Sequence, residues 1–419
     1  MPNQWLGRII LLQPQITKPM KILYIANRVP FPPHGGYPIV VYNSIKGAIN
    51  EGAEVTLFSL NTNKHYVSVR TLNDPLLDKI SFVTCSVNID VNAWKEVRSV
   101  MSKKSHNVYR FYKAAAVSQL RNLLRTNKFD IIQFEGLFVV PYLPLVRQLS
   151  DAKVVYRAHN IEYQIWEQQA FAERFPLRKL YLTYLSAKLR QFEFDHMNKF
   201  EAVATLNEAD LRELKYQGCS VRMENISVML DPDDYKPDGT SAEPLSIFHL
   251  GSMDWLPNQE GLEWFLDHVW DDLEKLNVGL TLHIAGSNIP PEIEELADND
   301  IRVYPHLDDA KNFMNSKSIM VVPLQSGSGM RVKIIEGMAM KKCIISTSLG
   351  AEGIRYEHGK NILIADTADD FYRYILQCTT DSGLVERIGE YARLLFERDH
   401  HIEPIGRKMM NFYEKLTLE

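Results

Sequence analysis

The alternation of short β-branched apolar runs with longer helical segments constrains the fold of this chain most. From Met20 onward, runs such as "KILYIAN" (21–27) and "AEVTLFSL" (53–60) flank helical stretches such as "GYPIVVYNSIKGAINEG" (36–52). This alternation is typical of βαβ units and predicts a parallel sheet. Further strands of the first half are expected at 80–87, 129–136, 153–160, 201–207 and 226–230.

The segment "DPDDYKPDGTSAEP" (231–244) interrupts the pattern with Pro, Asp, Gly and Ser and is the best linker candidate. The alternation then restarts. Strands of the second half are expected at 245–251, 279–286, 301–307, 318–324, 342–347 and 361–366. Thr367 and Asp370 resemble a capping box that opens the following helix.

These patterns divide the chain into an N-terminal extension and two domains, as expected for 419 residues at about 150 residues per domain. The expected parts are an extension (1–19), a first Rossmann-like domain (20–230), the linker (231–244), a second such domain (245–400) and a C-terminal helix (401–419) that packs back on the first domain. Two doubly wound halves place a ligand site in a cleft between them, beyond the carboxyl ends of the strands.

The composition limits the kinds of ligand and partner that we expect. With 45% apolar and 24% charged residues and a net charge of -5, the chain has no general field for nucleic acid, so an anion must be held by local groups. The four cysteines lack metal-ligand spacing and predict reduced thiols in a cytosolic protein without a metal site. We expect neither a signal peptide nor a membrane span.

The stretch "VVPLQSGSGMRVKIIEGMA" (321–339) places a Gly/Ser loop between a strand and a helix expected to begin near Met330. Small residues let a ligand approach the backbone, and a helix N-terminus favours an anion. Arg331 and Lys333 add cations, and Glu336 follows one turn later. Arg and Lys suit a diphosphate and a carboxylate suits a ribose diol, whereas an ordinary turn with a solvated helix face explains the same spacing equally well.

The same residues resemble the donor-site region of family 4 of the retaining GT-B glycosyltransferases, in the subgroup with a G-x-G-x-R-x-K-x-x-E pattern. The resemblance rests on "PLQSGSGMRVKIIEGMAMKKCIISTSLGAEGI" (323–354), "ANRVPFPPHGG" (26–36), "RAHNIEY" (157–163), "TLNEADL" (205–211) and "LGSMDWLPNQEGLEWF" (250–265). These landmarks occur in the family's order over nearly the whole chain.

The resemblance implies a GT-B fold and a metal-independent, retaining transfer of a sugar from a UDP- or GDP-type donor to a hydroxyl acceptor, as in polysaccharide biosynthesis. It implies that Arg331 and Lys333 neutralise the diphosphate, that Glu336 binds the ribose and that His159 contacts the sugar. Where many members carry a glutamate that contacts the sugar, this chain has Ser328.

The resemblance also implies a set of donor-binding residues in loops at the carboxyl ends of strands. The loops that close over or line the donor contain Gly35, Gly36, Asn160, Gly251, Ser252, Gly329, Glu352 and Gly353. No cofactor beyond the nucleotide sugar is expected.

Two other functions stay open: a nucleotide-sugar epimerase on the same architecture, and a non-catalytic nucleotide-sugar binding protein, suggested by Ser328. The acceptor is expected to be a glycan or a lipid-linked saccharide. The basic, aromatic segment 174–200 reads as a helix packed on its own domain or, alternatively, as a face that contacts an anionic membrane or a lipid-diphosphate acceptor. Segment 103–113 has the same character.

Overall fold

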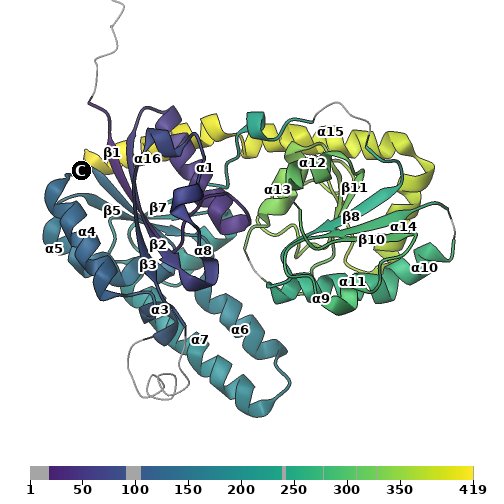
Figure 1. Ribbon diagram of the computed structural model, residues 1–419, viewed down its shortest axis with the longest axis horizontal. Helices are drawn as coiled ribbons and strands as arrows, with labels where there is room; N and C mark the ends of the chain where they lie inside the picture. The colour runs from purple at the N-terminus through teal and green to yellow at the C-terminus, as the bar shows by residue number, and fades with distance from the viewer. Residues whose placement is uncertain are drawn as a thin grey trace, which may run out of the picture.

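A computed structural model describes residues 18–90, 105–237, 242–276, 278–307, 309–327 and 329–418. In these residues the chain forms two sheets in which every strand pair is parallel, and helices cover their faces (Figure 1). Buried parallel sheets between helical layers define the doubly wound Rossmann-like architecture, so the predicted α/β fold class is confirmed. The expected extension 1–19 lies outside the described residues up to position 17.

The first sheet has seven strands in the order β3-β2-β1-β4-β5-β6-β7. Its strands are β1 (Lys21–Ala26), β2 (Glu54–Thr62), β3 (Ser81–Val87), β4 (Ile131–Glu135), β5 (Lys153–Ala158), β6 (Ala202–Thr205) and β7 (Arg222–Asn225). Its helices are α1 (Gly36–Asn50), α3 (His106–Tyr109), α4 (Ala114–Thr126), α5 (Leu143–Leu149), α6 (Glu162–Ala172), α7 (Pro176–Met197) and α8 (Glu208–Tyr216).

The second sheet has six strands in the order β10-β9-β8-β11-β12-β13. Its strands are β8 (Ser246–Leu250), β9 (Thr281–Ala285), β10 (Ile301–Tyr304), β11 (Ile319–Val322), β12 (Cys343–Ser346) and β13 (Leu363–Ile364). The helices of this half are α9 (Leu256–Phe265), α10 (Asp271–Glu274), α11 (Pro291–Glu294), α12 (Ala310–Asn315), α13 (Val332–Ala339), α14 (Ala368–Thr380) and α15 (Ser382–Asp399). The last helix, α16 (Ile402–Thr417), returns to the first half.

Each sheet has one point where the strand order reverses. It lies between β1 and β4 in the first sheet and between β8 and β11 in the second. In open parallel sheets the loops beyond the carboxyl ends of such strands diverge and leave room for a ligand. The loops after β1, β4, β8 and β11 are therefore where a site is expected on topological grounds.

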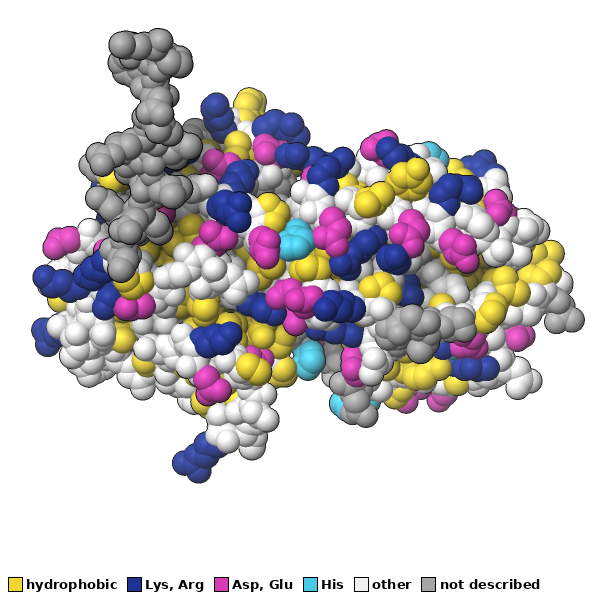
Figure 2. Space-filling view, turned by 90° about the horizontal axis from the view of Figure 1, so that it is seen from above, with side chains coloured by type: hydrophobic (Ala, Val, Ile, Leu, Met, Phe, Trp, Pro, Cys, Tyr) yellow, Lys and Arg dark blue, Asp and Glu magenta, His cyan; other side chains and the backbone are white. Residues whose placement is uncertain are grey.

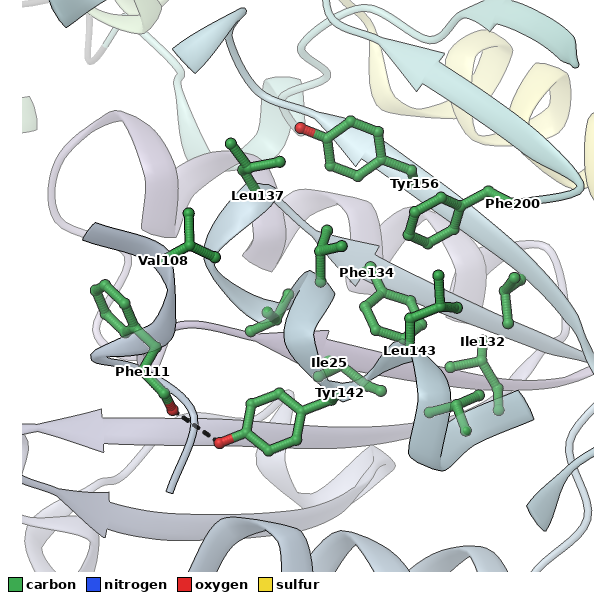
Figure 3. Close-up of a cluster of buried hydrophobic side chains, with 14 of the residues drawn as sticks. Ile25, Val108, Phe111, Ile132, Phe134, Leu137, Tyr142, Leu143, Tyr156 and Phe200 are labelled. Atoms are coloured by element: carbon green, nitrogen blue, oxygen red, sulfur yellow. Dashed lines mark hydrogen bonds between the residues drawn. The ribbon is translucent and has the colours of Figure 1, made fainter. Parts of the chain in front are cut away.

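The core of the first half is made by apolar side chains of the sheet that meet the covering helices. Phe134, Tyr156 and Phe200 pack on one face (Figure 3). At the edge of this cluster the buried Tyr142 hydroxyl donates to the carbonyl of Phe111 at 2.8 Å. A buried hydroxyl is costly without such a partner, so this bond allows the aromatic ring to be used in the core.

One predicted strand is wrong. Segment 226–230 is not a strand, and the seventh strand is Arg222–Asn225. Ile226 and Met229 pack in the core of the first half, whereas Val228 and Leu230 pack in that of the second. The alternation that looked like a strand therefore comes from an extended segment that crosses between two cores.

The end of the chain crosses at the same place. The Leu230 amide donates to the carbonyl of His400 at 2.9 Å, and the Ile402 amide donates to the carbonyl of Leu230 at 3.0 Å. Beyond this crossing α16 packs against α1 of the first half (Figure 1), where Gly47 and Gly406 let the two backbones approach closely. The two halves are thus joined by two segments of the chain that cross side by side.

Three local features complete the description of the fold. The Thr367 hydroxyl accepts from the Asp370 amide at 3.2 Å, and α14 begins directly after it, as the capping pattern predicts. All four cysteines are buried and none forms a disulfide. In the part of the chain that the structure describes, no helix is long and apolar enough to cross a membrane.

Candidate functional site

The loop between β11 and α13, here called the glycine loop, requires glycine at positions 327 and 329. Gly327 and Gly329 have φ values of 99° and 88°, which side chains rarely adopt. A Cβ atom on Gly329 would lie 1.9 Å from the Asn160 side-chain oxygen, and one on Gly327 would lie 2.8 Å from the Trp255 ring. The loop of the second half therefore touches Asn160 of the first half. Ser328, between these glycines, lies outside the described residues.

Arg331 is the last residue before α13, which begins at Val332, two residues after the expected Met330. Its guanidinium lies over the Trp255 ring at 4.9 Å and donates to the Gly329 carbonyl. The side chain is 5% exposed, and this burial lowers the pKa of Arg331 to about 10. Glu352, whose charge opposes that shift, accepts from the Gly329 amide at 3.1 Å. Arg331 and Glu352 thus both hold the loop at Gly329.

Lys333 lies at the carboxyl end of β8. Its ammonium donates to the Leu250 carbonyl at 3.1 Å and to the Asn258 side-chain oxygen at 2.9 Å. Burial lowers the pKa of Lys333 to about 7, with a smaller contribution from the nearby charge of Arg331. Both oxygens that hold this amine are neutral. A desolvated cation beside a second cation favours an anionic ligand.

Gly251 and Ser252 adjoin this lysine. The Asn258 amide nitrogen donates to the Ser252 carbonyl at 2.8 Å, and a Cβ on Gly251 would lie 2.6 Å from that nitrogen. Asn258 therefore ties the loop after β8 to Lys333, and Gly251 leaves the room that its amide occupies.

Glu336 has a different set of partners. Its carboxylate accepts from the Tyr235 hydroxyl at 3.1 Å. Burial raises the pKa of Glu336 to about 7, although the bond from Tyr235 and the charge of Lys311 oppose the shift. The Lys311 ammonium lies 4.3 Å from the centre of the Tyr235 ring. Tyr235 belongs to the expected linker, so that segment supplies a buried partner to the site.

His159 lies at the carboxyl end of β5 in the first half. Its Nε2 lies 2.6 Å from a carboxylate oxygen of Glu135, and its ring stacks on Tyr37 with centroids 4.7 Å apart. Tyr37 donates to the Glu135 carbonyl at 3.2 Å and accepts from the Asn27 amide at 3.1 Å. The imidazole is therefore fixed from two sides.

Glu135 has buried partners of its own. The Gln133 amide donates to its second oxygen at 2.5 Å, and the Tyr413 hydroxyl donates to the side-chain oxygen of Gln133. Tyr413 lies on α16. A continuous chain of buried hydrogen bonds thus connects the C-terminal helix to His159, and such fully paired networks hold side chains in one arrangement.

The loop after β1 approaches the second half at Gly36. A Cβ atom there would lie 3.5 Å from the Val332 side chain at the start of α13. The preceding Gly35 has a φ of 83° and caps α1. Gly353, with a φ of 80°, lies in the same way against Asn207 of the first half. These glycines lie where the two halves meet.

The structure brings together most of the predicted residues. Around the glycine loop it joins Gly36, Asn160, Gly329, Arg331 and Glu352. Lys333 with Gly251 and Ser252 forms an adjoining group, Glu336 lies with Tyr235, and His159 with Tyr37. Among the described residues no cluster of three or more His, Cys, Asp or Glu could hold a metal ion.

Several partners were not anticipated from the sequence: Arg28, Tyr37, Glu135, Tyr235, Trp255 and Asn258. Trp255 and Asn258 lie within the landmark 250–265, and Glu135 is a polar residue at the end of an apolar strand, which is a usable signal. Tyr235 stands among turn residues, and nothing in the sequence around it indicates a role in the site. The Arg28 guanidinium lies 5.1 Å from the Tyr37 ring centre and extends the stack that includes His159.

Comparison with known proteins finds a family model that matches part of the chain and solved structures of similar fold. A model of the family "Glycosyl transferases group 1" matches residues 244–381. An "uncharacterized 44.6 kDa protein in cps region" of Klebsiella pneumoniae is 24% identical over 281 residues, which cover 64% of this chain and 70% of that protein.

Solved structures share the two-domain arrangement. Sucrose-phosphate synthase of Thermosynechococcus elongatus superposes with a TM-score of 0.69 at 15% identity, covering 95% of this chain and 99% of that one. Anabaena HepE in complex with UDP and glucose gives 0.63 at 15% identity, with 94% and 99% covered. A point mutant of S. aureus TarM, with UDP among its ligands, gives 0.66 at 12% identity, with 94% and 99% covered. These likenesses support the GT-B fold, and the family match supports a glycosyltransferase.

Proposed function

We propose that this protein is a glycosyltransferase that moves a sugar from a nucleotide-diphosphate sugar to a hydroxyl acceptor. One observation carries the proposal: Arg331 and Lys333, both with a pKa lowered by burial, lie at the start of α13 beside a glycine loop that touches the other half of the molecule. Two desolvated cations and the first amides of a helix suit a diphosphate. The family match over 244–381 and the UDP in the structures of HepE and TarM agree with it.

The difficult step is the departure of the nucleotide diphosphate, because negative charge grows on the leaving oxygen. Arg331, Lys333 and the first amides of α13 would stabilise that charge, so the proposed reaction needs no divalent metal. The carbon–oxygen bond to the diphosphate breaks as the acceptor oxygen bonds to the same carbon. The acceptor proton passes to the leaving phosphate. We propose retention of configuration, in line with the family resemblance.

The remaining residues would hold the donor. Glu336, bonded to the Tyr235 hydroxyl, would accept from the ribose hydroxyls of a UDP- or GDP-type donor. His159, fixed by Glu135 and Tyr37, would contact the sugar. The loops with Gly35, Gly36, Asn160, Gly251, Ser252, Ser328, Gly329, Glu352 and Gly353 would line the donor.

The two halves of the molecule would differ in the substrates they bind. Residues 245–400 would hold the nucleotide of the donor, and residues 20–230 would bind the acceptor in addition to lining the donor with the loops named above, with the 401–419 helix against this first half. The acceptor would be a glycan or a lipid-linked saccharide in polysaccharide biosynthesis, consistent with the "cps region" of the Klebsiella relative. The enzyme would act in the cytoplasm, and a lipid-linked acceptor would bring it to the inner membrane surface.

A panel of UDP- and GDP-sugars, incubated with and without an acceptor extract, tests the proposal. Nucleotide release that depends on acceptor supports transfer, and the anomeric configuration of the product, read by NMR, tests retention. An epimerised sugar without acceptor would indicate the epimerase. Binding of a nucleotide sugar without turnover would indicate a binding protein.

The matched variants are Lys333→Ala and Lys341→Ala. Both remove an amine from α13 or its end, but Lys341 is on the surface, 41% exposed, and bonds Glu390. We expect lost turnover in the first variant only. Equal turnover in both would refute the role of the buried cation.

A further inference from the structure

The end of the hairpin formed by α6 and α7 exposes an unusual number of large apolar side chains. Within residues 171–180, here called the hairpin tip, the exposed fractions are 84% for Phe171, 71% for Phe175, 85% for Leu177 and 69% for Leu180. Single exposed apolar residues are common, but four large ones within ten residues indicate an interaction surface.

The tip extends beyond the body of the protein. No residue from 171 to 184 is buried, and the first buried residue of α7 is Leu185. Because an α-helix rises about 1.5 Å per residue, the first nine residues of α7 reach about 14 Å past this point. Figure 1 shows α6 and α7 projecting from the first half and the connection between them at the far end. A helix end that contacts only water is expected to be polar on all sides, and this one is not.

Cations surround this apolar tip. Residues 171–190 contain five Lys or Arg and one Glu, a net charge of +4, whereas the whole chain has -5. Arg174, Arg178 and Lys179 lie within the tip, where Lys179 lies over the Phe171 ring and Arg178 pairs with the tip's single acid, Glu173. On the face seen in Figure 2, by contrast, acidic and basic side chains are interspersed.

From these observations we infer that the hairpin tip inserts into an anionic membrane surface. Phe171, Phe175, Leu177 and Leu180 would enter the boundary between headgroups and acyl chains, and the cations would bind lipid phosphates. A second copy of the chain is a poorer occupant, because a symmetric contact would bring two charges of +4 together.

The position of the hairpin deepens the proposed function, and this part rests on it. α6 begins two residues after Asn160, which touches the glycine loop, and its 11 residues span about 17 Å. A membrane at the tip would therefore lie within reach of the acceptor side, as a lipid-linked saccharide requires. The affinity of the tip for membranes does not depend on that function.

Co-sedimentation of the full chain with vesicles tests the inference. We expect binding to vesicles of phosphatidylcholine with phosphatidylglycerol, weaker binding to phosphatidylcholine alone, and release by salt. The variant F171S/F175S/L177S should reduce the partition coefficient by about tenfold or more. R174E/R178E should remove the preference for anionic vesicles, since each cation near the surface contributes roughly fivefold.

The matched control is L394S/L418S, which removes two exposed leucines from α15 and the end of the chain. It should bind vesicles like the unaltered protein. If the unaltered protein does not bind anionic vesicles, or if the tip and control variants bind alike, the inference fails. It also fails if gel filtration shows a concentration-dependent dimer that the tip variant abolishes while vesicle binding is absent.

The same samples separate this inference from the proposed function. UDP binding by calorimetry and turnover with a water-soluble acceptor should be unchanged in the tip variant, because the tip lies outside the donor site. Loss of folding would appear as a lowered Tm. Vesicle binding without any UDP binding would refute the donor site and leave the tip standing.

Discussion

Replacing Lys333 by Met should make the empty protein more stable and its nucleotide binding weaker. Burial of the ammonium and, to a smaller extent, the nearby charge of Arg331 lower its pKa from 10.5 to about 7, and its two hydrogen-bond acceptors are neutral oxygens. The difference corresponds to an upper bound of about 4.8 kcal/mol for keeping the charge in the folded state. Methionine fills a similar volume without the charge.

The net gain is smaller for two reasons. Solvent reaches part of the side chain, so we halve the electrostatic figure to about 2.4 kcal/mol. The Leu250 carbonyl and the Asn258 side chain each lose a donor, at a cost of about 1 kcal/mol in total after partial rehydration. We therefore expect the free energy of unfolding at pH 7 to rise by about 1–2 kcal/mol, while the dissociation constant for UDP rises about 30- to 150-fold.

The pH dependence distinguishes this mechanism from simple repacking. In the unaltered protein Lys333 has a folded pKa below its unfolded value, so it imposes no penalty above pH 10.5, a growing penalty as pH falls, and a constant one below about 7. The electrostatic advantage of Lys333→Met should thus disappear as pH rises from 7 to above 10.5, with a slope that reaches about 1.4 kcal/mol per pH unit where the unfolded state binds one more proton than the folded state.

Urea unfolding at several pH values, together with calorimetry of UDP binding, measures both effects. Lys275→Met is the control, because that lysine is 71% exposed on the surface and pairs with Asp272 there. An advantage of Lys333→Met that does not change with pH, or unaltered UDP affinity, would refute the reasoning.

Three further changes probe the same site. Arg331→Ala should remove about 2–4 kcal/mol of transition-state stabilisation, measured as kcat/KM with a nucleotide-sugar donor, and a rate equal to that of Lys341→Ala would contradict its role. Gly329→Ala should weaken UDP binding or lower stability by about 1–3 kcal/mol, because a φ of 88° and the contact with Asn160 both oppose a side chain; the double variant with Asn160→Ala should recover only the part due to contact, and full recovery would exclude backbone strain. Below a pH of about 7, protonation of Glu336 should weaken UDP binding while protonation of Lys333 strengthens it, so the UDP affinity of the unaltered protein relative to that of Glu336→Gln should fall as pH drops; a ratio that does not change with pH would contradict the role of Glu336.

Much of the fold follows from local pattern. The apolar runs at 21–27 and 318–324 contain β1 and β11 because parallel strands are buried on both faces and read as continuous apolar segments. Segment 226–230 shows the limit of this reading. Its alternating apolar residues face two different cores, and no local pattern distinguishes that from the two faces of one sheet.

The sequence by itself determined the glycines, the cations and the carboxylate of the loop 327–336, and their order along the chain. Only the tertiary structure decided their surroundings: the amine of Lys333 is held by Leu250 and Asn258, Glu336 by Tyr235, and the Gly329 backbone by Glu352 and Asn160. The pKa of a side chain depends on burial and on charges within a few ångströms, and the groups that supply them are distant in sequence. The residue types of the loop and their order were therefore readable in advance, and the burial and charges that surround them were not.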